Sequence, residues 1–147
     1  MNVWYSLSDI PGDEASVVTI GNFDGMHNGH KKVVSTCIER AHKLGVDAVA
    51  ITFDPHPIQV HKPEVGLQLI SPLRDRLDAM AAAGLDATLV AHYDASVYSL
   101  EPEEFVYEYL VERCGAREVV VGEDFRFGRG NAGTIDTLRE LGSRYGF

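Results

Sequence analysis

The sequence Val-Val-Thr-Ile-Gly-Asn-Phe-Asp-Gly-Met-His-Asn-Gly-His, residues 17–30, joins a short apolar run to a pattern with helical periodicity. The run that ends at Ile20 is typical of a strand buried on both faces. The glycines of the turn let the backbone approach an anion, and a helix that begins near Gly29 offers free N–H groups and a positive dipole end. His27 and His30 add two ring donors. Such a strand, turn and helix are typical of a phosphate site in an α/β protein.

The rest of the chain alternates strand-like and helix-like segments. We expect strands at 17–20, 47–53, 87–93 and 119–121, an edge strand at 3–5, and helices at 30–44, 71–84, 101–115 and 134–145. The helix at 71–84 would begin with a Ser71 cap and Pro72. This order predicts a Rossmann-like α/β fold, a parallel sheet with helices on both faces. Ligands of such sheets bind beyond the carboxyl ends of the strands, so the turns at Gly21, Asp54 and Gly122 should meet at one edge.

The composition describes one acidic, folded domain. The 147 residues are 45% hydrophobic, and their formal charge is −9 with a sequence pI near 5.0. This charge disfavours nucleic acid as a partner, because polyanion binding depends on clustered Lys and Arg. No apolar run approaches about 18 residues and no signal peptide is recognisable, so we expect neither a membrane protein nor a secreted one. Cys37 and Cys114 stand apart in helical patterns, which favours core thiols and a cytoplasmic setting.

Two further segments place chemically active side chains at predicted strand ends. The turn Asp-Pro-His-Pro at 54–57 is stiff, because two prolines should continue neither a strand nor a helix. It could position a substrate or hold Mg²⁺ through water, or its Asp could simply cap backbone N–H groups. The loop Gly-Glu-Asp-Phe-Arg-Phe-Gly at 122–128 suits a flat ring that carries a phosphate, with Phe125 and Phe127 as core residues the alternative.

Two other patterns are rejected as ligand sites. Gly128, Gly130 and Gly133 spell G-x-G-x-x-G, but five or more loop residues separate them from the preceding strand, and no acid follows about 20 residues later. A zinc site at His27 and His30 lacks a third ligand at a suitable spacing. The remaining histidines are expected at the surface or at the rim of a site, and they are His42, His61 and His92.

The motifs at the three predicted turns resemble those of a known family. The His-x-Gly-His core at 27–30 is similar to the signature of the nucleotidylyltransferase superfamily. The longer Gly-Asn-Phe-Asp-Gly-x-His-x-Gly-His resembles the FAD synthetase (FMN adenylyltransferase) module of bacterial bifunctional riboflavin kinase/FMN adenylyltransferases. Residues 52–57 resemble that family's Thr-Phe-Asp/Glu-Pro-x-Pro, and 122–128 its Gly-x-Asp/Asn-Phe-x-Phe-Gly. The resemblance runs from Ser16 onward, with the motifs in the family's order.

This resemblance implies an enzyme that transfers AMP from ATP to FMN, giving FAD and pyrophosphate. Mg²⁺ would bridge the phosphates, with no direct protein ligand assigned. The implied catalytic residues are His27, His30, Asn22 and Asp54. The implied ATP-binding residues are Gly21, Asn22, Phe23, Asp24, Gly25, His27, Gly29 and His30. The implied flavin-binding residues are Asp54, Pro55, His56, Pro57, Asp124, Phe125, Arg126, Phe127 and Gly128.

The sequence also departs from the family. Family modules continue with an Ile-Ser-Ser-Thr-x-Ile-Arg-type motif that contacts the triphosphate and with a riboflavin kinase barrel, and residues 1–147 contain neither. We therefore expect residues 1–147 to be an FAD synthetase domain that is incomplete at its C-terminus and weakly active or inactive alone, with a riboflavin kinase domain in the full-length chain. His61 stands where the family's flavin side is expected to carry an apolar or aromatic residue.

Two other functions stay open. A cytidylyltransferase of the glycerol-phosphate type shares a Gly-x-Phe-Asp-x-x-His-x-Gly-His pattern but not the Asp-Phe-Arg-Phe-Gly loop. A noncatalytic flavin- or nucleotide-binding module would retain ligands without turnover. A truncated aminoacyl-tRNA synthetase, which has a similar histidine motif, is disfavoured by size, acidity and the missing tRNA domains.

Overall fold

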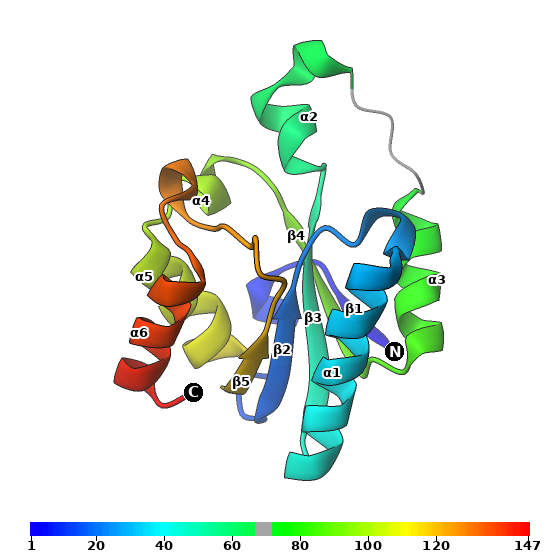
Figure 1. The fold of residues 1–147 in the computed structure, drawn as a ribbon, viewed down its shortest axis with the longest axis vertical. Coiled ribbons are helices and arrows are strands. Elements are labelled where there is room, and N and C mark those ends of the chain that lie inside the picture. Colours follow the sequence, from blue (N-terminus) through cyan, green and yellow to red (C-terminus); the bar gives the residue numbers. More distant parts are fainter. Residues whose placement is uncertain (67–71) are drawn as a thin grey trace.

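The structure is a computed structural model that describes residues 1–66 and 72–147. The described residues form a five-stranded parallel sheet in the order β1-β4-β3-β2-β5 (Figure 1). The strands are β1 (Asn2–Trp4), β2 (Ser16–Ile20), β3 (Asp47–Asp54), β4 (Ala87–His92) and β5 (Ala116–Val120). The predicted Rossmann-like α/β class is confirmed, and so is the edge strand near residues 3–5.

Helices cover both faces of this sheet (Figure 1). One face carries α1 (Asn28–Leu44) and α3 (Leu73–Ala83). The other carries α4 (Ala95–Tyr98), α5 (Pro102–Phe105), the π-helical segment η4 (Val106–Arg113) and α6 (Ile135–Tyr145). The short α2 (Pro57–His61) projects beyond the end of β3. Single 3-10 turns occur at η1 (Leu7–Asp9), η2 (Asp24–Met26), η3 (Pro63–Val65) and η5 (Arg129–Asn131).

The two halves of the core come from alternate residues of the central strands. All five residues of β2 are buried, as expected for a strand covered on both faces. Val18 and Ile20 pack with the residues of η4 and α6, whereas Val17 packs with α1 and α3. Each such side chain stabilises the fold by roughly 1.5–3 kcal/mol. Cys37 and Cys114 are buried free thiols in these two halves, as predicted.

The structure corrects the expectation for residues 54–57. The strand ends at Asp54 as predicted, but Pro57 begins α2 instead of continuing a loop. Proline suits the first helical position, because its missing N–H would have no partner inside the helix. His56 caps this helix: its Nδ1 accepts from the Ile58 N–H at 3.1 Å, and the His56 N–H donates to Gln59 Oε1 at 3.1 Å.

One other helix differs from the expectation, and the start of another is only partly described. The single helix expected at 101–115 is α5 followed by a π-helical η4, where the Cys114 N–H bonds to the Tyr109 carbonyl at 3.1 Å. The expected Ser71 cap lies outside the described residues, and α3 is described from Leu73, with Pro72 before it.

The order of the strands places the expected ligand edge. The chain lays β3, β4 and β1 on one side of β2 and β5 on the other, so the direction of winding reverses between β2 and β5. The turns after β2, β3 and β5 follow the carboxyl ends of adjacent strands near this switch point, which is where such sheets bind ligands. Among the described residues, none of the helices combines the length and apolar character needed to cross a bilayer.

Candidate functional site

The turn after β2 is built on the buried ring of Phe23. This ring lies against Gly21, where an added Cβ would approach it to 3.1 Å. Phe23 and Met26 have positive φ angles of 54° and 43°, a conformation that costs a non-glycine residue roughly 1–2 kcal/mol. Burial of both side chains offsets this cost. The turn therefore brings the Gly21 backbone to the ligand edge, and the buried Phe23 ring packs against Gly21.

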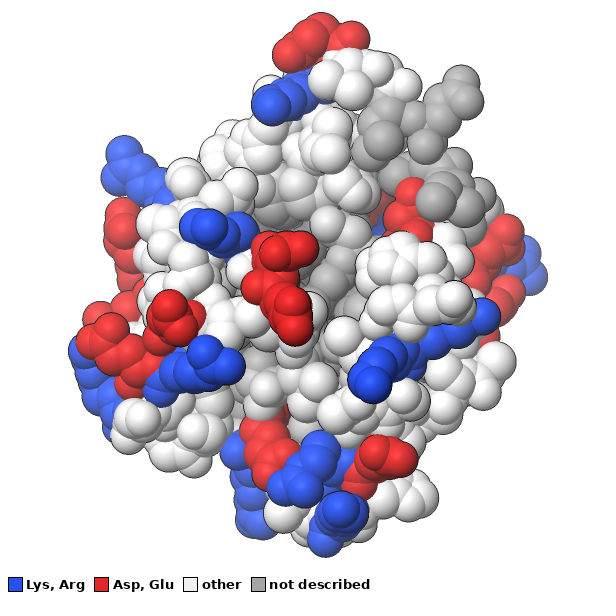
Figure 2. All heavy atoms as spheres, viewed as in Figure 1, with Lys and Arg blue, Asp and Glu red and all other residues white. Residues whose placement is uncertain are grey.

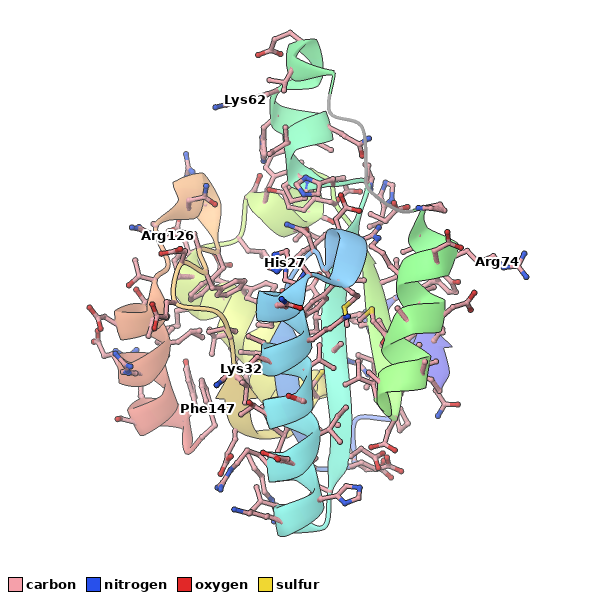
Figure 3. All side chains as sticks on the ribbon, turned by 45° about the vertical axis from the view of Figure 1, so that its right-hand side comes forward. His27, Lys32, Lys62, Arg74, Arg126 and Phe147 are labelled. Carbon is pink, nitrogen blue, oxygen red and sulfur yellow. The ribbon has the colours of Figure 1, made fainter. Side chains whose placement is uncertain are left out.

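His27 precedes α1 and presents a defined ring nitrogen. The Gly29 N–H donates to His27 Nδ1 at 3.1 Å, so a neutral His27 carries its proton on Nε2. The ring stacks on His30 with the centroids 3.6 Å apart. Figure 3 shows His27 at the N-terminal end of α1, where the free N–H groups of the helix also lie. Two kinds of donor for an anion, the His27 ring and the N–H groups at the start of α1, are thus gathered at one place.

His30 is half-buried between two other rings. It meets Phe23 edge to face, with the centroids 5.5 Å apart, and His27 on its own flat side. Burial and the neighbouring His27 lower the pKa of His30, against an opposing effect of Asp24. Within the described part of the chain, His30 Nδ1 is buried without a hydrogen-bond partner. The ring is therefore held mainly neutral, with unused hydrogen-bonding capacity.

These groups line a cavity of about 310 Å³, which we call the histidine pocket. It lies between the turn after β2, the start of α1 and the loop after β5. Its lining residues are Ile20, Gly21, Phe23, His27, Gly29, His30, Val33, Gly122, Glu123, Asp124 and Phe125.

The loop after β5 is folded around Phe127. The Phe127 N–H donates to the Gly133 carbonyl at 3.1 Å, and the Gly133 N–H donates back at 2.8 Å. A Cβ on Gly133 would come within 2.6 Å of the Phe127 ring. Phe127 is buried and packs beside Phe105. Phe125 is half-buried and stacks on Phe127, with the ring centroids 5.6 Å apart. Gly128 and Gly133 therefore serve close packing, against Pro102 and Phe127, whereas an added Cβ on Gly130 would meet nothing within 4 Å.

A second cavity, of about 350 Å³, is lined largely by aromatic rings, and we call it the aromatic pocket. Phe53 and Tyr93 meet edge to face at 5.7 Å, and Tyr98 lies 5.6 Å from Tyr93. Burial raises the pKa of Tyr93, with a smaller contribution from Tyr98. The lining residues are Gly21, Asn22, Phe53, His56, Pro57, Ile58, Tyr93, Val97, Tyr98, Phe105, Asp124, Phe125, Arg126, Phe127, Gly128 and Asn131.

His61 closes one side of this ring cluster. It is exposed on α2, and its Nε2 lies 2.7 Å from the Tyr93 hydroxyl. Its ring also meets Tyr98 edge to face at 4.7 Å. His61 is therefore a rim residue, as predicted, and it supports the aromatic pocket through Tyr93 and Tyr98. His42 and His92 are exposed, also as predicted.

The two pockets adjoin, and they share Gly21, Asp124 and Phe125. Of the predicted ATP-binding residues, Gly21, Phe23, His27, Gly29 and His30 line the histidine pocket. Asn22 lines the aromatic pocket, and Asp24 and Gly25 line neither. Of the predicted flavin-binding residues, His56, Pro57 and 124–128 line the aromatic pocket, whereas Asp54 and Pro55 do not. A larger hollow of about 500 Å³ between β5 and α6 contains none of the predicted site residues.

The structure adds residues that the sequence analysis did not select. Tyr93 and Tyr98 come from a segment without a recognised motif, so their place in the aromatic pocket depends on the folded chain. Arg76 is 1% exposed, and its Nη1 donates to the Asn22 carbonyl at 2.6 Å. The available signal was its position on α3, three residues after Leu73 and four before Met80, on the apolar stripe of that helix.

The electrostatics of the ligand edge are mixed. Burial lowers the pKa of His56, Asp24 opposes this effect, and the Arg76 charge adds to it. Figure 2 shows acidic and basic side chains interspersed over the face drawn. The described residues include no group of three or more His, Cys, Asp or Glu arranged to hold a metal ion.

The sheet order and the glycine–histidine turn at its switch point are typical of an α/β nucleotide-binding domain. The sequence matches the FAD synthetase family over residues 9–147. This chain belongs to the FAD synthetase family, which confirms the family resemblance seen in the motifs.

Curated relatives agree with this assignment. The chain is 40% identical over 130 residues to a putative bifunctional riboflavin kinase/FMN adenylyltransferase of Geobacillus thermodenitrificans, covering 88% of this chain and 68% of that protein. It is 32% identical over 143 residues to the bifunctional riboflavin kinase/FMN adenylyltransferase of Escherichia coli K12, covering 97% of this chain and 45% of the relative. The chain thus spans less than half of the length of the E. coli relative.

Solved structures support the fold. A structure described as a macrolide-efflux protein from Streptococcus pneumoniae has a TM-score of 0.83 at 25% identity, covering 95% of this chain and 54% of that one. A universal stress protein from Archaeoglobus fulgidus has a TM-score of 0.52 at 13% identity, covering 86% of this chain and 92% of the other. The second similarity concerns the Rossmann-like fold alone.

Proposed function

We propose that this chain binds ATP in the histidine pocket and FMN in the aromatic pocket, for transfer of AMP to FMN. The observation that carries the proposal is that the two pockets share Gly21, Asp124 and Phe125. The product FAD consists of a nucleotide half and a flavin half joined by a pyrophosphate. Two adjoining pockets with different linings suit these two halves.

The histidine pocket has the donors that a triphosphate requires. The N-terminus of α1 and the His27 ring lie at one mouth, beside the Gly21 backbone, whose N–H donates to the Ile51 carbonyl at 3.1 Å. A hydrogen bond to a charged partner contributes about 1.5–3 kcal/mol. Where such a contact tightens in the transition state, its loss lowers turnover on the order of 10²-fold.

The aromatic pocket suits the flavin ring. Tyr93, Tyr98 and Phe53 offer flat apolar surfaces, and Arg126 lies on the lining near the shared wall. Aromatic rings stack on or meet the edge of another flat ring, and an arginine can bind a phosphate at two points. Figure 3 shows Arg126 on the loop after β5.

The proposed reaction is a direct displacement without a covalent enzyme intermediate. An FMN phosphate oxygen attacks the α-phosphorus of ATP, a new P–O bond forms, and the bond to the departing pyrophosphate breaks in line. The residues of the two pockets position the reactants and stabilise the developing negative charge. His27, with Nε2–H directed by its bond to Gly29, is placed to donate to a phosphate oxygen.

We propose that Mg²⁺ arrives bound to the phosphates of ATP. Phosphate oxygens are the ligands that Mg²⁺ prefers, and it reduces the charge of the group being transferred. Glu123 and Asp124 line the histidine pocket, so phosphates that carry a divalent cation would meet less repulsion there. The riboflavin kinase activity that the relatives' names record is proposed for a longer protein, outside residues 1–147.

A thermal-melt panel with Mg·ATP, Mg·CTP, FMN and FAD tests the proposal. A ligand that binds only the folded state stabilises it by RT ln(1 + [L]/Kd), about 2.7 kcal/mol at 100 times Kd. We expect upward shifts with Mg·ATP, FMN and FAD and none with Mg·CTP. A shift with Mg·CTP alone would favour the cytidylyltransferase, and the absence of any shift would contradict binding by this chain. Binding without FAD formation by a chain as long as its relatives would favour a noncatalytic module.

A further inference from the structure

Arg76 is a buried cation that joins two elements of the proposed site. It lies in the first turn of α3, and its side chain is 1% exposed. Arginine is almost never fully buried in proteins unless it is paired. We therefore expect hydrogen bonds or an ion pair that compensate the charge of Arg76.

The bonds of Arg76 converge on the Asn22 carbonyl. Arg76 Nη1 donates to this oxygen at 2.6 Å and lies 3.3 Å from Thr52 Oγ1. Thr52 Oγ1 donates to the same carbonyl at 3.1 Å. The turn after β2, the end of β3 and the start of α3 are thus joined at one oxygen atom. Asn22 lines the aromatic pocket, and its neighbour Gly21 lines both pockets.

The charge of Arg76 is only partly compensated. Its Nη2 lies 3.9 Å from Asp54 Oδ1, beyond hydrogen-bond distance, and the Asp54 side chain is 44% exposed. Within residues 1–66 and 72–147, Nε and Nη2 of Arg76 are buried without hydrogen-bond partners. An apolar side chain of similar volume often stabilises a protein as well as such a buried charge, or better. Stability alone therefore gives little reason for an arginine here.

We propose that Arg76 is a positioning residue that holds the turn after β2 at a fixed place relative to the end of β3, so that the two pockets keep a common wall. Arg76 lines neither pocket, so it acts through Asn22 and Thr52 and through the charge facing Asp54. The inference rests on the proposed binding of ATP and FMN in these pockets.

The test compares three variants of this chain. Arg76→Met removes the donor and the charge at similar volume, and Arg76→Lys keeps the charge but not the fork of donors. Arg74→Met is the matched control, because Arg74 lies on the same helix, is exposed and points away from the body (Figure 3). The measurements are the melting temperature, amide hydrogen exchange in residues 21–27, and the Kd for Mg·ATP and for FMN.

We expect Arg76→Met to melt at or above the temperature of the original chain. We also expect its amides at 21–27 to exchange about tenfold faster and both Kd values to rise about tenfold. Arg76→Lys should recover part of both effects, and Arg74→Met should change neither. A lower melting temperature in both Arg76 variants, with ligand affinity reduced only in proportion to unfolding, would overturn the inference. So would unchanged exchange at 21–27, or faster exchange with unchanged affinity.

The exchange measurement separates this inference from the proposed function. If the original chain binds neither Mg·ATP nor FMN, the proposed function fails. Amide exchange at 21–27 that becomes faster without Arg76 would still support the inference that Arg76 fixes the turn after β2. Exchange that does not depend on Arg76 would overturn this inference too.

Discussion

His27 and His30 share one turn of backbone, yet their environments differ. His27 is exposed and has one ring nitrogen fixed by the Gly29 N–H. His30 is half-buried against Phe23, and burial and His27 lower its pKa. A bound phosphate would oppose this lowering of the His30 pKa, because a nearby negative charge favours the charged imidazole. Under the proposed function, this pair donates hydrogen bonds to the ATP phosphates.

The first prediction concerns these two side chains. We expect His27→Ala and His30→Ala each to raise the Kd for Mg·ATP about tenfold or more, since each removes a donor to a charged group. The Kd for FMN should stay within about twofold, because neither histidine lines the aromatic pocket. Calorimetric titration measures both constants. His42→Ala, an exposed histidine later on α1, is the control. An unchanged Kd for Mg·ATP in both variants would contradict the assignment.

The second prediction concerns pH. The pKa of His30 is below its ordinary value of 6.5 in the folded chain, so the unfolded chain binds more protons near and below that pH. The contribution of neutral His30 to the free energy of unfolding should therefore be fully present at neutral pH. It should be lost as the pH decreases below about 6.5. We expect a lower melting temperature at about pH 5 than at about pH 7.5, and a smaller difference in His30→Gln. His42→Gln should leave the difference unchanged, and an equal acid sensitivity of His30→Gln would refute this reading.

At the scale of elements, the loop after β5 depends on close packing between Phe127 and Gly133. We expect Gly133→Ala to destabilise the chain by about 1–3 kcal/mol, because its Cβ would lie 2.6 Å from the Phe127 ring. The displaced ring should also weaken FMN binding. Gly122→Ala is the control, since nothing lies within 4 Å of its added Cβ. Denaturant unfolding and FMN titration measure the two effects, and a Gly133→Ala chain as stable as Gly122→Ala would contradict the packing argument.

The elements divide into those that local sequence determines and those that it does not. The apolar run up to Ile20 and the amphipathic helix after His30 carry their own signals, and both were predicted closely. The two prolines at 54–57 predict a loop, because proline interrupts strands and helix interiors. In the structure Pro57 instead begins α2, and His56 and Gln59 form a capping box at its start. The start of α2 is therefore determined by a local capping signal in the sequence.

The site shows the same division. The turns near His27 and Phe125 carry recognisable motifs, and the folded chain brings them to one edge as predicted. The aromatic pocket also needs Tyr93 and Tyr98, which meet His61 only through tertiary packing. Arg76 was missed because a charged side chain is usually taken as exposed, and its burial is decided by the Asn22 carbonyl across the fold.

At the scale of the whole molecule, the buried core stabilises the sheet, and the turns at one edge of the sheet form the two pockets. The two core halves fix the sheet, while the turns after its strands form two pockets with different linings at the switch point. Membership of the FAD synthetase family agrees with a pocket that contains two histidines beside a pocket that is rich in aromatic rings. Under the proposed function, one molecule of FAD spans both pockets, with Gly21, Asp124 and Phe125 beside its pyrophosphate.

The most direct test is a calorimetric titration of FAD into this chain, repeated with saturating FMN and with saturating Mg·ATP. If FAD spans both pockets, each ligand alone should lower the apparent FAD affinity in proportion to its own occupancy. Competition by both FMN and Mg·ATP is the predicted result. Competition by only one of them, or by neither, would contradict the assignment of the two pockets to the two halves of FAD.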